Sequence, residues 1–176
     1  NVIDPEYIIN NYGADAVRLF ILSDSPPEKD IQWSEQGMLA AYKFVQKFWI
    51  LHKKITEEIN NKKRNSENEN LTIFTNKLIQ KYTSSLDKFN MNVLIAYLHE
   101  TYNFLSKEIE KLDIKDLKEN YSKILILMYP ILPHLISECI KDVQKINTVS
   151  WPVSQKEYLE EKYVNIVIQI NGKKKS

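Results

Sequence analysis

Apolar residues recur at every third or fourth position along most of this chain, and this period restricts its fold more than any other feature. In residues 35–59, for example, Ala41, Phe44, Phe48 and Ile55 fall on one stripe, which is the pattern of an amphipathic helix. The 176 residues include only 3 Gly and 6 Pro, whereas sheets and barrels usually use these residues at frequent turns. The sequence therefore predicts an all-α fold.

The helical pattern divides into a short lead-in and a bundle. Asp4-Pro5 is a typical helix start and Gly13 a typical stop, and a second short helix is expected over residues 14–23. Ser34 is a good N-cap for the long helix that follows it. Further bundle helices are expected over residues 71–89, 92–112 and 114–129, with a last one after Pro133.

The C-terminal end has a different pattern. Residues 163–170 (YVNIVIQI) are rich in β-branched side chains, and Asn171-Gly172 is a strong hairpin signal. The chain stops four residues later, so we expect a truncated strand at the start of a β-containing domain, with the returning strand missing. Asn1 is not an initiator residue, which leads us to expect that the chain was cut from a longer protein.

These patterns give the predicted domain organisation. It consists of a connecting segment at 1–34, a helical bundle at 35–150 with a mobile loop at about 60–70, a linker at 151–162 and the β-containing start at 163–176.

Charge is unevenly distributed along the first third of the chain. Residues 1–40 carry seven acidic and two basic side chains, whereas residues 41–64 carry seven basic and two acidic ones. In the long helix, Lys43, Lys47, Lys53 and Lys54 are expected to share the polar side, which is compatible with a phosphate-facing patch. A charged helix face is more often simply solvated, and the sequence leaves both interpretations open.

No pattern of catalytic residues is found. The three glycines are too far apart for a phosphate-binding loop, and no serine, histidine and aspartate arrangement is recognisable. His134 and Glu138 are one helical turn apart, but such a pair is rarely a metal site. Cys139 lies on an apolar stripe, where a packed thiol is expected. We therefore predict neither catalytic nor metal-binding residues in this chain, and no cofactor.

Composition also suggests a compartment. A single cysteine fits a reducing environment. The strongest apolar stretch, residues 124–136, is interrupted by Pro130 and Pro133 and falls short of the roughly 20 residues that span a membrane. We expect a cytoplasmic protein that does not bind membranes.

Several motifs resemble one known family. They are Tyr12-Gly13-Ala14-Asp15, Arg18-Leu19, Pro26 to Asp30 and Trp33-Ser34 in the opening segment, FNMNVLIAYLHETYNFL from Phe89, YPILPHLISECI from Tyr129, SWP from Ser150 and VIQINGK from Val167. The opening segment resembles the stretch that follows the signature Lys-Met-Ser-Lys-Ser loop of class I aminoacyl-tRNA synthetases. Within that class, the motifs look most like those of bacterial leucyl-tRNA synthetases, and the resemblance covers nearly all of the chain outside residues 60–70.

The resemblance implies a fold and a function. The bundle would be the anticodon-binding domain of a leucine–tRNA ligase, an enzyme that uses ATP and Mg²⁺ to attach leucine to tRNA. The catalytic half would precede residue 1, so this piece alone is expected to be inactive. Its implied partners are tRNA, most specifically tRNA-Leu, and the remainder of the synthetase chain, rather than DNA.

The resemblance also suggests two groups of site residues. The first would contact tRNA phosphates and consists of Lys43, Lys47, Lys53, Lys54, Lys62, Lys63 and Arg64. The family often has arginine at the positions of Lys43 and Lys47, so planar bidentate contacts are in doubt here while electrostatic attraction remains. The second group, Asp15, Arg18 and Trp33, could support the signature loop, although simple packing is favoured for these residues.

Two alternatives stay open at this stage. The chain could be the same domain of a valyl-, isoleucyl- or methionyl-tRNA synthetase, because these enzymes share the segment after the signature loop and the bundle. It could also be a free-standing helical module that binds a protein or RNA. Salt dependence distinguishes an RNA-binding surface from an apolar protein-binding groove.

Overall fold

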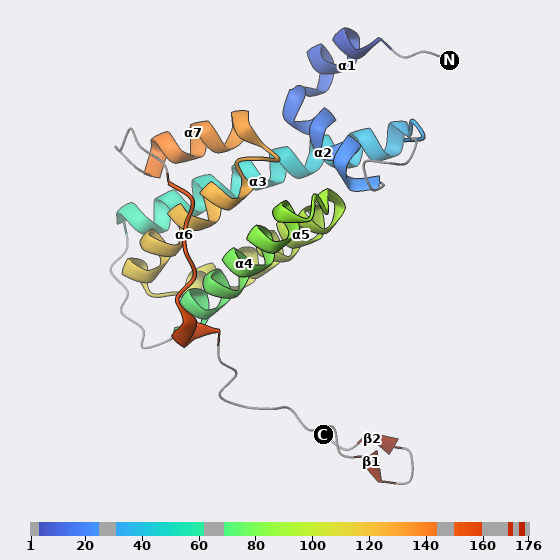
Figure 1. Cartoon of the computed structure of the whole chain (residues 1–176). Coiled ribbons are helices and arrows are strands. Elements are labelled where there is room, and N and C mark those ends of the chain that lie inside the picture. The colour runs from blue at the N-terminus through green and yellow to red at the C-terminus, as the bar shows by residue number, and fades with distance from the viewer. Residues whose placement is uncertain are drawn as a thin grey trace.

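The computed structural model describes residues 4–24, 31–61, 69–143, 150–159, 169–170 and 173–174. Within these ranges it is a helical bundle, which confirms the predicted fold class (Figure 1). Its α-helices are α1 (Pro5–Tyr12), α2 (Ala14–Asp24), α3 (Glu35–Asn61), α4 (Asn70–Asp87), α5 (Met91–Glu108), α6 (Ile114–Met128) and α7 (Pro133–Val143).

The lead-in helices begin and end where the local sequence predicts. The Asp4 side chain accepts a hydrogen bond from the Glu6 backbone N–H at 2.9 Å, and Pro5 occupies the first helical position. Gly13 ends α1 with a φ of 82°, a conformation that favours glycine. Helix α2 then starts in a new direction, so that α1 lies at the end of the bundle (Figure 1).

Helix α3 is the longest element and packs against α2, α6 and α7. It starts at the predicted cap, where the Ser34 Oγ accepts a hydrogen bond from the Gly37 N–H at 3.1 Å. Gly37 also permits close packing on α2, because a Cβ at this position would lie 2.8 Å from the Phe20 ring. The predicted apolar stripe is buried against the neighbouring helices, and both Leu51 and His52 belong to it.

The remaining helices complete one continuous core. Helices α4 and α5 form a hairpin, α4 packs on α6, and α6 packs on α7. The 3₁₀ turn η1 (Ile109–Lys111) follows α5 directly. Tyr82 and Tyr121 are among the largest fully buried side chains and pack in this core.

The segment after the bundle is attached to α4. The Trp151 Nε1–H donates to the Thr83 Oγ1 at 3.0 Å, and the Gln155 N–H donates to the Asn76 Oδ1 at 2.7 Å. A 3₁₀ turn, η2 (Lys156–Tyr158), follows and also contacts α4. The described part of the predicted linker is therefore packed along the bundle.

Two short strands are described near the C-terminus. Strand β1 (Gln169–Ile170) pairs antiparallel with β2 (Lys173–Lys174), with Ile170 opposite Lys173. A two-residue returning strand is therefore present where the sequence analysis expected none. Residues 163–168 and 171–172 lie outside the described ranges, so the longer predicted strand, its hairpin turn and its truncation stay predictions.

None of the described helices combines the length and the apolar character needed to cross a membrane.

Candidate nucleic-acid interface

Three of the predicted phosphate-binding lysines lie together on an exposed side of α3. Because α3 turns by about 100° per residue, Lys43, Lys47 and Lys54 lie together about 100° around the helix from the buried Phe44–Phe48 stripe, and all three are exposed. Ile50, with 69% of its surface exposed, lies on the same side. Within the described part of the chain, Lys43 and Lys47 form no ion pair, so their ammonium groups are available to a partner.

Lys53 and Lys54 are already paired within the fold. The Lys53 Nζ lies 2.7 Å from the Asp142 Oδ2 on α7 and 4.2 Å from the centre of the Trp49 ring. The Lys54 Nζ lies 2.7 Å from the Glu110 Oε1 in η1, and this hydrogen bond and charge raise the Lys54 pKa. Because Lys53 points toward α7, the four predicted lysines do not share one face.

The remaining predicted phosphate-binding residues, Lys62, Lys63 and Arg64, lie outside the described residues. Their contact with phosphate stays a prediction, as does that of the four lysines of α3.

Asp15 belongs to the second predicted group, and it joins the lead-in to the end of the bundle. Its side chain, 7% exposed, reaches the first turn of α7, where it accepts hydrogen bonds from the Leu135 N–H at 2.7 Å and from the His134 N–H at 3.4 Å. It thus caps α7 from another helix, at the helix end where backbone N–H groups lack partners.

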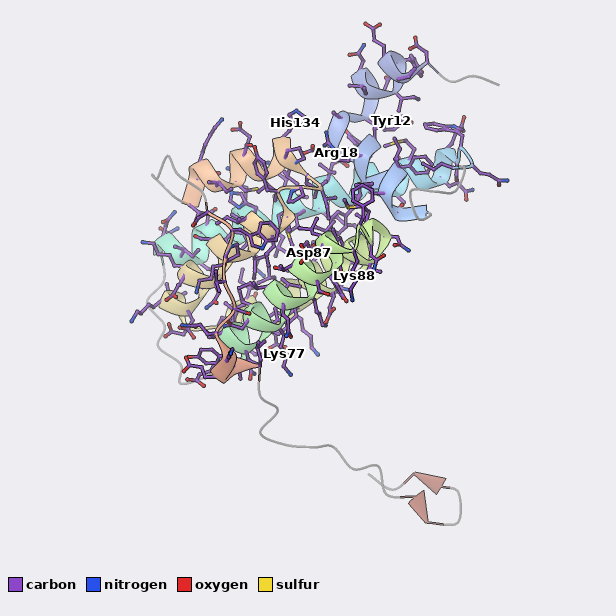
Figure 2. All side chains as sticks on the ribbon, viewed as in Figure 1. Tyr12, Arg18, Lys77, Asp87, Lys88 and His134 are labelled. Atoms are coloured by element: carbon purple, nitrogen blue, oxygen red, sulfur yellow. The ribbon has the colours of Figure 1, made fainter. Side chains whose placement is uncertain are left out.

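Two further side chains donate to Asp15. The Arg18 Nη1 lies 2.8 Å from the Asp15 Oδ1, and the His134 Nδ1–H donates to the same oxygen at 2.9 Å. Figure 2 shows Arg18 and His134 close together near the end of α7. Local sequence could not identify this contact, because Asp15 and His134 are separated by 119 positions.

Trp33, the third member of the second group, packs on the lead-in. Its ring meets Phe20 edge-on, with 5.4 Å between the ring centres, and 38% of its surface is exposed. Asp15 and Trp33 thus both make contacts within the chain, and the packing role that the sequence analysis favours stays a prediction. Support of a signature loop stays a prediction.

A cleft of about 500 Å³ opens beside Asp15. It is formed by the turn between α1 and α2, by α3 and by the first turns of α7, and the side chains that matter for its chemistry are Tyr12, Trp49, His134 and Glu138. His134 and Glu138 are the pair that the sequence placed on one helical face. Across the described residues, no group of three or more His, Cys, Asp or Glu side chains is arranged to hold a metal ion.

A buried polar network connects α3 with α6 and α7. His52 is fully buried, its Nδ1 accepts a hydrogen bond from the Tyr121 hydroxyl at 2.9 Å, and its Nε2–H donates to the Asp142 Oδ2 at 3.1 Å. Only the neutral ring satisfies both contacts in this way. Burial lowers the pKa of His52, although the hydrogen bond and the charge of Asp142 act in the opposite direction.

This network makes stability depend on pH. The folded-state pKa of His52 lies below its ordinary value of 6.5, so the unfolded chain binds more protons as the pH falls below about 6.5. We therefore expect the free energy of unfolding to decrease from pH 7.5 to pH 5.5, which urea denaturation at constant ionic strength measures.

Two variants test whether His52 causes this pH dependence of the free energy of unfolding. The His52→Gln variant, which cannot take up the proton, should lose less stability than the native chain over the same pH range. Desolvation also lowers the pKa of His99, so this residue contributes to the pH dependence as well. The His99→Gln variant measures that contribution. If the His52→Gln variant keeps the full pH dependence, the assignment to His52 is wrong.

Cys139 is fully buried on α7, as its position on an apolar stripe predicts. Burial, followed by the nearby charge of Asp142, raises the pKa of this thiol to about 12. The thiol is therefore packed in its protonated form, which is unsuited to nucleophilic chemistry.

Comparisons with known proteins agree on one family. Residues 68–176 match the model described as "Anticodon-binding domain of tRNA ligase". The chain is 38% identical over 186 residues to the leucine–tRNA ligase of Jannaschia sp. and 35% identical over 181 residues to that of Orientia tsutsugamushi. Both alignments cover 100% of this chain but 21% of the relative, so the chain spans about one fifth of the length of these relatives.

A solved structure supports the fold. The chain resembles a crystal structure of the ternary complex of an Agrobacterium radiobacter leucyl-tRNA synthetase with tRNA and LeuAMS, with a TM-score of 0.84 and 23% sequence identity. The match covers 100% of this chain and 24% of that one.

Proposed function

We propose a tRNA-docking function from one premise: this chain belongs to the family of anticodon-binding domains of tRNA ligases. The chain would be the part of a leucine–tRNA ligase that holds tRNA-Leu while the remainder of the ligase carries out the reaction. The similarity to leucine–tRNA ligases supports the amino-acid assignment. The similar synthetase structure that contains tRNA supports the choice of partner.

One observation carries the proposed docking mode. Lys43 and Lys47 are exposed on the same side of α3 and form no ion pair within the described part of the chain. A lysine ammonium is a compact charge that attracts a phosphate without selecting a base. Two such groups one helical turn apart suit the regular phosphates of an RNA backbone, and a positive surface also speeds association.

Lys53 and Lys54 would act differently from this pair. Each ammonium has a carboxylate 2.7 Å away, so a phosphate would have to compete with Asp142 or Glu110 for it. We propose Lys43 and Lys47 as the main phosphate contacts on α3, with Lys53 and Lys54 as weaker ones. Lys62, Lys63 and Arg64 remain in the proposal from their charge alone.

The chemistry of the whole ligase lies outside this chain. We propose that the complete protein attaches leucine to tRNA, as the names of its relatives suggest, and that it uses the ATP and Mg²⁺ that the family resemblance implies. The described residues offer no cluster suited to a metal ion, and the sequence has no glycine loop for phosphates. No step of the reaction is therefore assigned to residues of this chain, and it should form no leucyl-tRNA alone. The expected cytoplasmic location stays part of this proposal.

Binding to RNA tests the docking mode directly. An in vitro transcript of a bacterial tRNA-Leu is titrated with the chain at several KCl concentrations. Replacing Lys43 and Lys47 by alanine should weaken binding about tenfold near 0.1 M salt and reduce the salt slope of log Kd by about 2, because two phosphate contacts are removed.

A charge-matched control completes this experiment. Lys107 on α5 and Lys118 on α6 are also exposed, and their double alanine variant changes the net charge equally. It should bind the transcript within about twofold of the native chain. The proposed docking mode is wrong if both double variants behave alike, or if binding is insensitive to salt, as expected for an apolar protein-binding module.

A further inference from the structure

The cleft between the α1–α2 turn, α3 and α7 has walls suited to a flat ring. Tyr12 and Trp49 contribute aromatic side chains, and Gly13 and Ala14 contribute small lining residues. Tyr12 is fixed by an edge-on contact with Tyr42, with 5.6 Å between the ring centres. Aromatic side chains of this kind stack on nucleobases of any sequence.

Trp49 has different neighbours along the helix. Val45, one turn before it, lines the same cleft. Lys53 and His52, about one turn after it, contact the indole with distances to its ring centre of 4.2 Å and 5.4 Å. The lysine therefore places a positive charge next to the cleft without being one of its lining residues.

At the α7 side of the cleft, His134 and Glu138 supply hydrogen-bond acceptors. The His134 Nδ1–H is committed to Asp15; in this tautomer the Nε2 is an acceptor that points away from Asp15, and 71% of this side chain is exposed. The exposed carboxylate of Glu138 lies one turn further along α7. A ligand that complements this edge must carry N–H donors.

The charges around the cleft exclude a simple anion site. Asp15 is paired with Arg18 at 2.8 Å, and Glu138 with Lys141 at 2.6 Å. The lining itself contributes two carboxylates and no lysine or arginine. A phosphate would find no cation inside, whereas a neutral ring meets no electrostatic barrier.

The volume of the cleft limits which kind of ligand it can hold. A volume of about 500 Å³ falls in the range of small-molecule sites, about 300–1,000 Å³. An α-helix with its side chains is about 10 Å wide and would need a longer groove. A single nucleotide fits the available space.

We propose that this cleft takes one unpaired nucleobase of the docked RNA, with guanine as the best match. The base would stack on Tyr12 and lie beside the Trp49 indole, whose ring already contacts His52 and Lys53. The N–H donors of the base would face Glu138 and the His134 Nε2. The neighbouring phosphate would stay outside, near the Lys53 ammonium at the rim. This inference rests on the proposed tRNA-docking function and adds a specific pocket to it.

The experiment uses mononucleotides, so that its outcome is independent of tRNA docking. The 20.8 kDa chain is titrated by NMR with GMP, AMP, UMP and ribose 5-phosphate, and the indole N–H signal of Trp49 is followed. Trp151 lies outside the cleft and its indole N–H donates a hydrogen bond to Thr83, so its signal serves as the internal reference. GMP should shift the Trp49 signal most, and ribose 5-phosphate should leave it unchanged.

Matched variants test the stacking contact of Tyr12 and the hydrogen bond to Glu138 separately. Tyr12→Ala should weaken GMP binding at least about fivefold, because one stacking surface is lost, whereas Tyr7→Ala should leave it within twofold. Tyr7 lies on the same helix, is 65% exposed and is not a cleft residue. Glu138→Gln, which alters only an exposed side chain, should weaken GMP binding about tenfold.

Three outcomes would overturn the proposal. The first is no Trp49 shift with GMP up to 10 mM, or an equal shift with ribose 5-phosphate. The second is unchanged GMP affinity in both the Tyr12→Ala and the Glu138→Gln variants. The third is a Trp49 shift with free L-arginine but not with GMP, which would identify a protein side chain as the ligand. Salt-dependent tRNA binding through Lys43 and Lys47 could persist in each case, so failure here is distinguishable from failure of the docking function.

Discussion

Replacing Asp15 by alanine should lower the free energy of unfolding by about 3 kcal/mol, because four hydrogen bonds to a buried carboxylate are lost together. The Leu135 and His134 N–H groups at the start of α7 lose their cap, which by itself costs about 1 kcal/mol. Arg18 and the His134 ring also lose their acceptor, but both side chains are partly exposed, so each of these contacts contributes about 1 kcal/mol. Urea denaturation of the purified chain measures the change.

Asp4 provides the matched control for this effect. Its carboxylate also caps a helix, with a 2.9 Å hydrogen bond to the Glu6 N–H, but it is exposed and serves only α1. Asp4→Ala should therefore cost about 1 kcal/mol or less. Equal losses for the two variants would show that the long-range contacts of Asp15 add nothing to stability.

Replacing His52 by alanine should also cost about 3 kcal/mol. The ring fills fully buried space beside Trp49 and Tyr121, with 5.4 Å and 5.9 Å between the ring centres. Removing it leaves a cavity, and large-to-small substitutions in a core cost about 2–5 kcal/mol. The buried hydroxyl of Tyr121 also loses its acceptor, which adds the cost of an unsatisfied polar group. Urea denaturation at pH 7.5 measures this loss.

Two variants isolate the parts of this effect. Tyr121→Phe keeps the ring but removes the hydroxyl, so it should cost about 1–2 kcal/mol, because the His52 Nδ1 is left unpaired. His99→Ala alters an exposed histidine that touches Phe44 and should cost less than His52→Ala. If His52→Ala and His99→Ala lower the free energy of unfolding equally, the buried hydrogen-bond network of His52 adds nothing to stability.

Asp15 and His52 have related roles in the proposed function. Asp15 fixes α2 to the first turn of α7, and His52 fixes α3 to α6 and, through Asp142, to α7. These contacts therefore fix the helix that carries Lys43 and Lys47 relative to the helices that line the cleft. We expect the Asp15→Ala chain to bind tRNA more weakly even where it remains folded, because its cleft is no longer fixed.

The sequence predicted the helices because their determinants are local. Asp4, Gly13 and Ser34 act through backbone groups within a few residues, so their caps could be identified from the sequence. The buried stripe of α3 follows from the helical period. The family resemblance also depends on short motifs, and comparison of the whole chain supports it.

Only the tertiary structure decided how the charged side chains are used. Lys43 and Lys53 look equivalent in the sequence, but the packing of α7 beside α3 supplies Asp142 to Lys53 and no carboxylate within the described residues to Lys43. Asp15 likewise gains its cap role from a helix 119 positions away. Contacts over such distances depend on how the helices pack against one another, and the helical period specifies which face is buried but not which residue lies opposite. The sequence alone therefore determined the helices and the family, whereas packing determined which lysines are free and where the cleft lies.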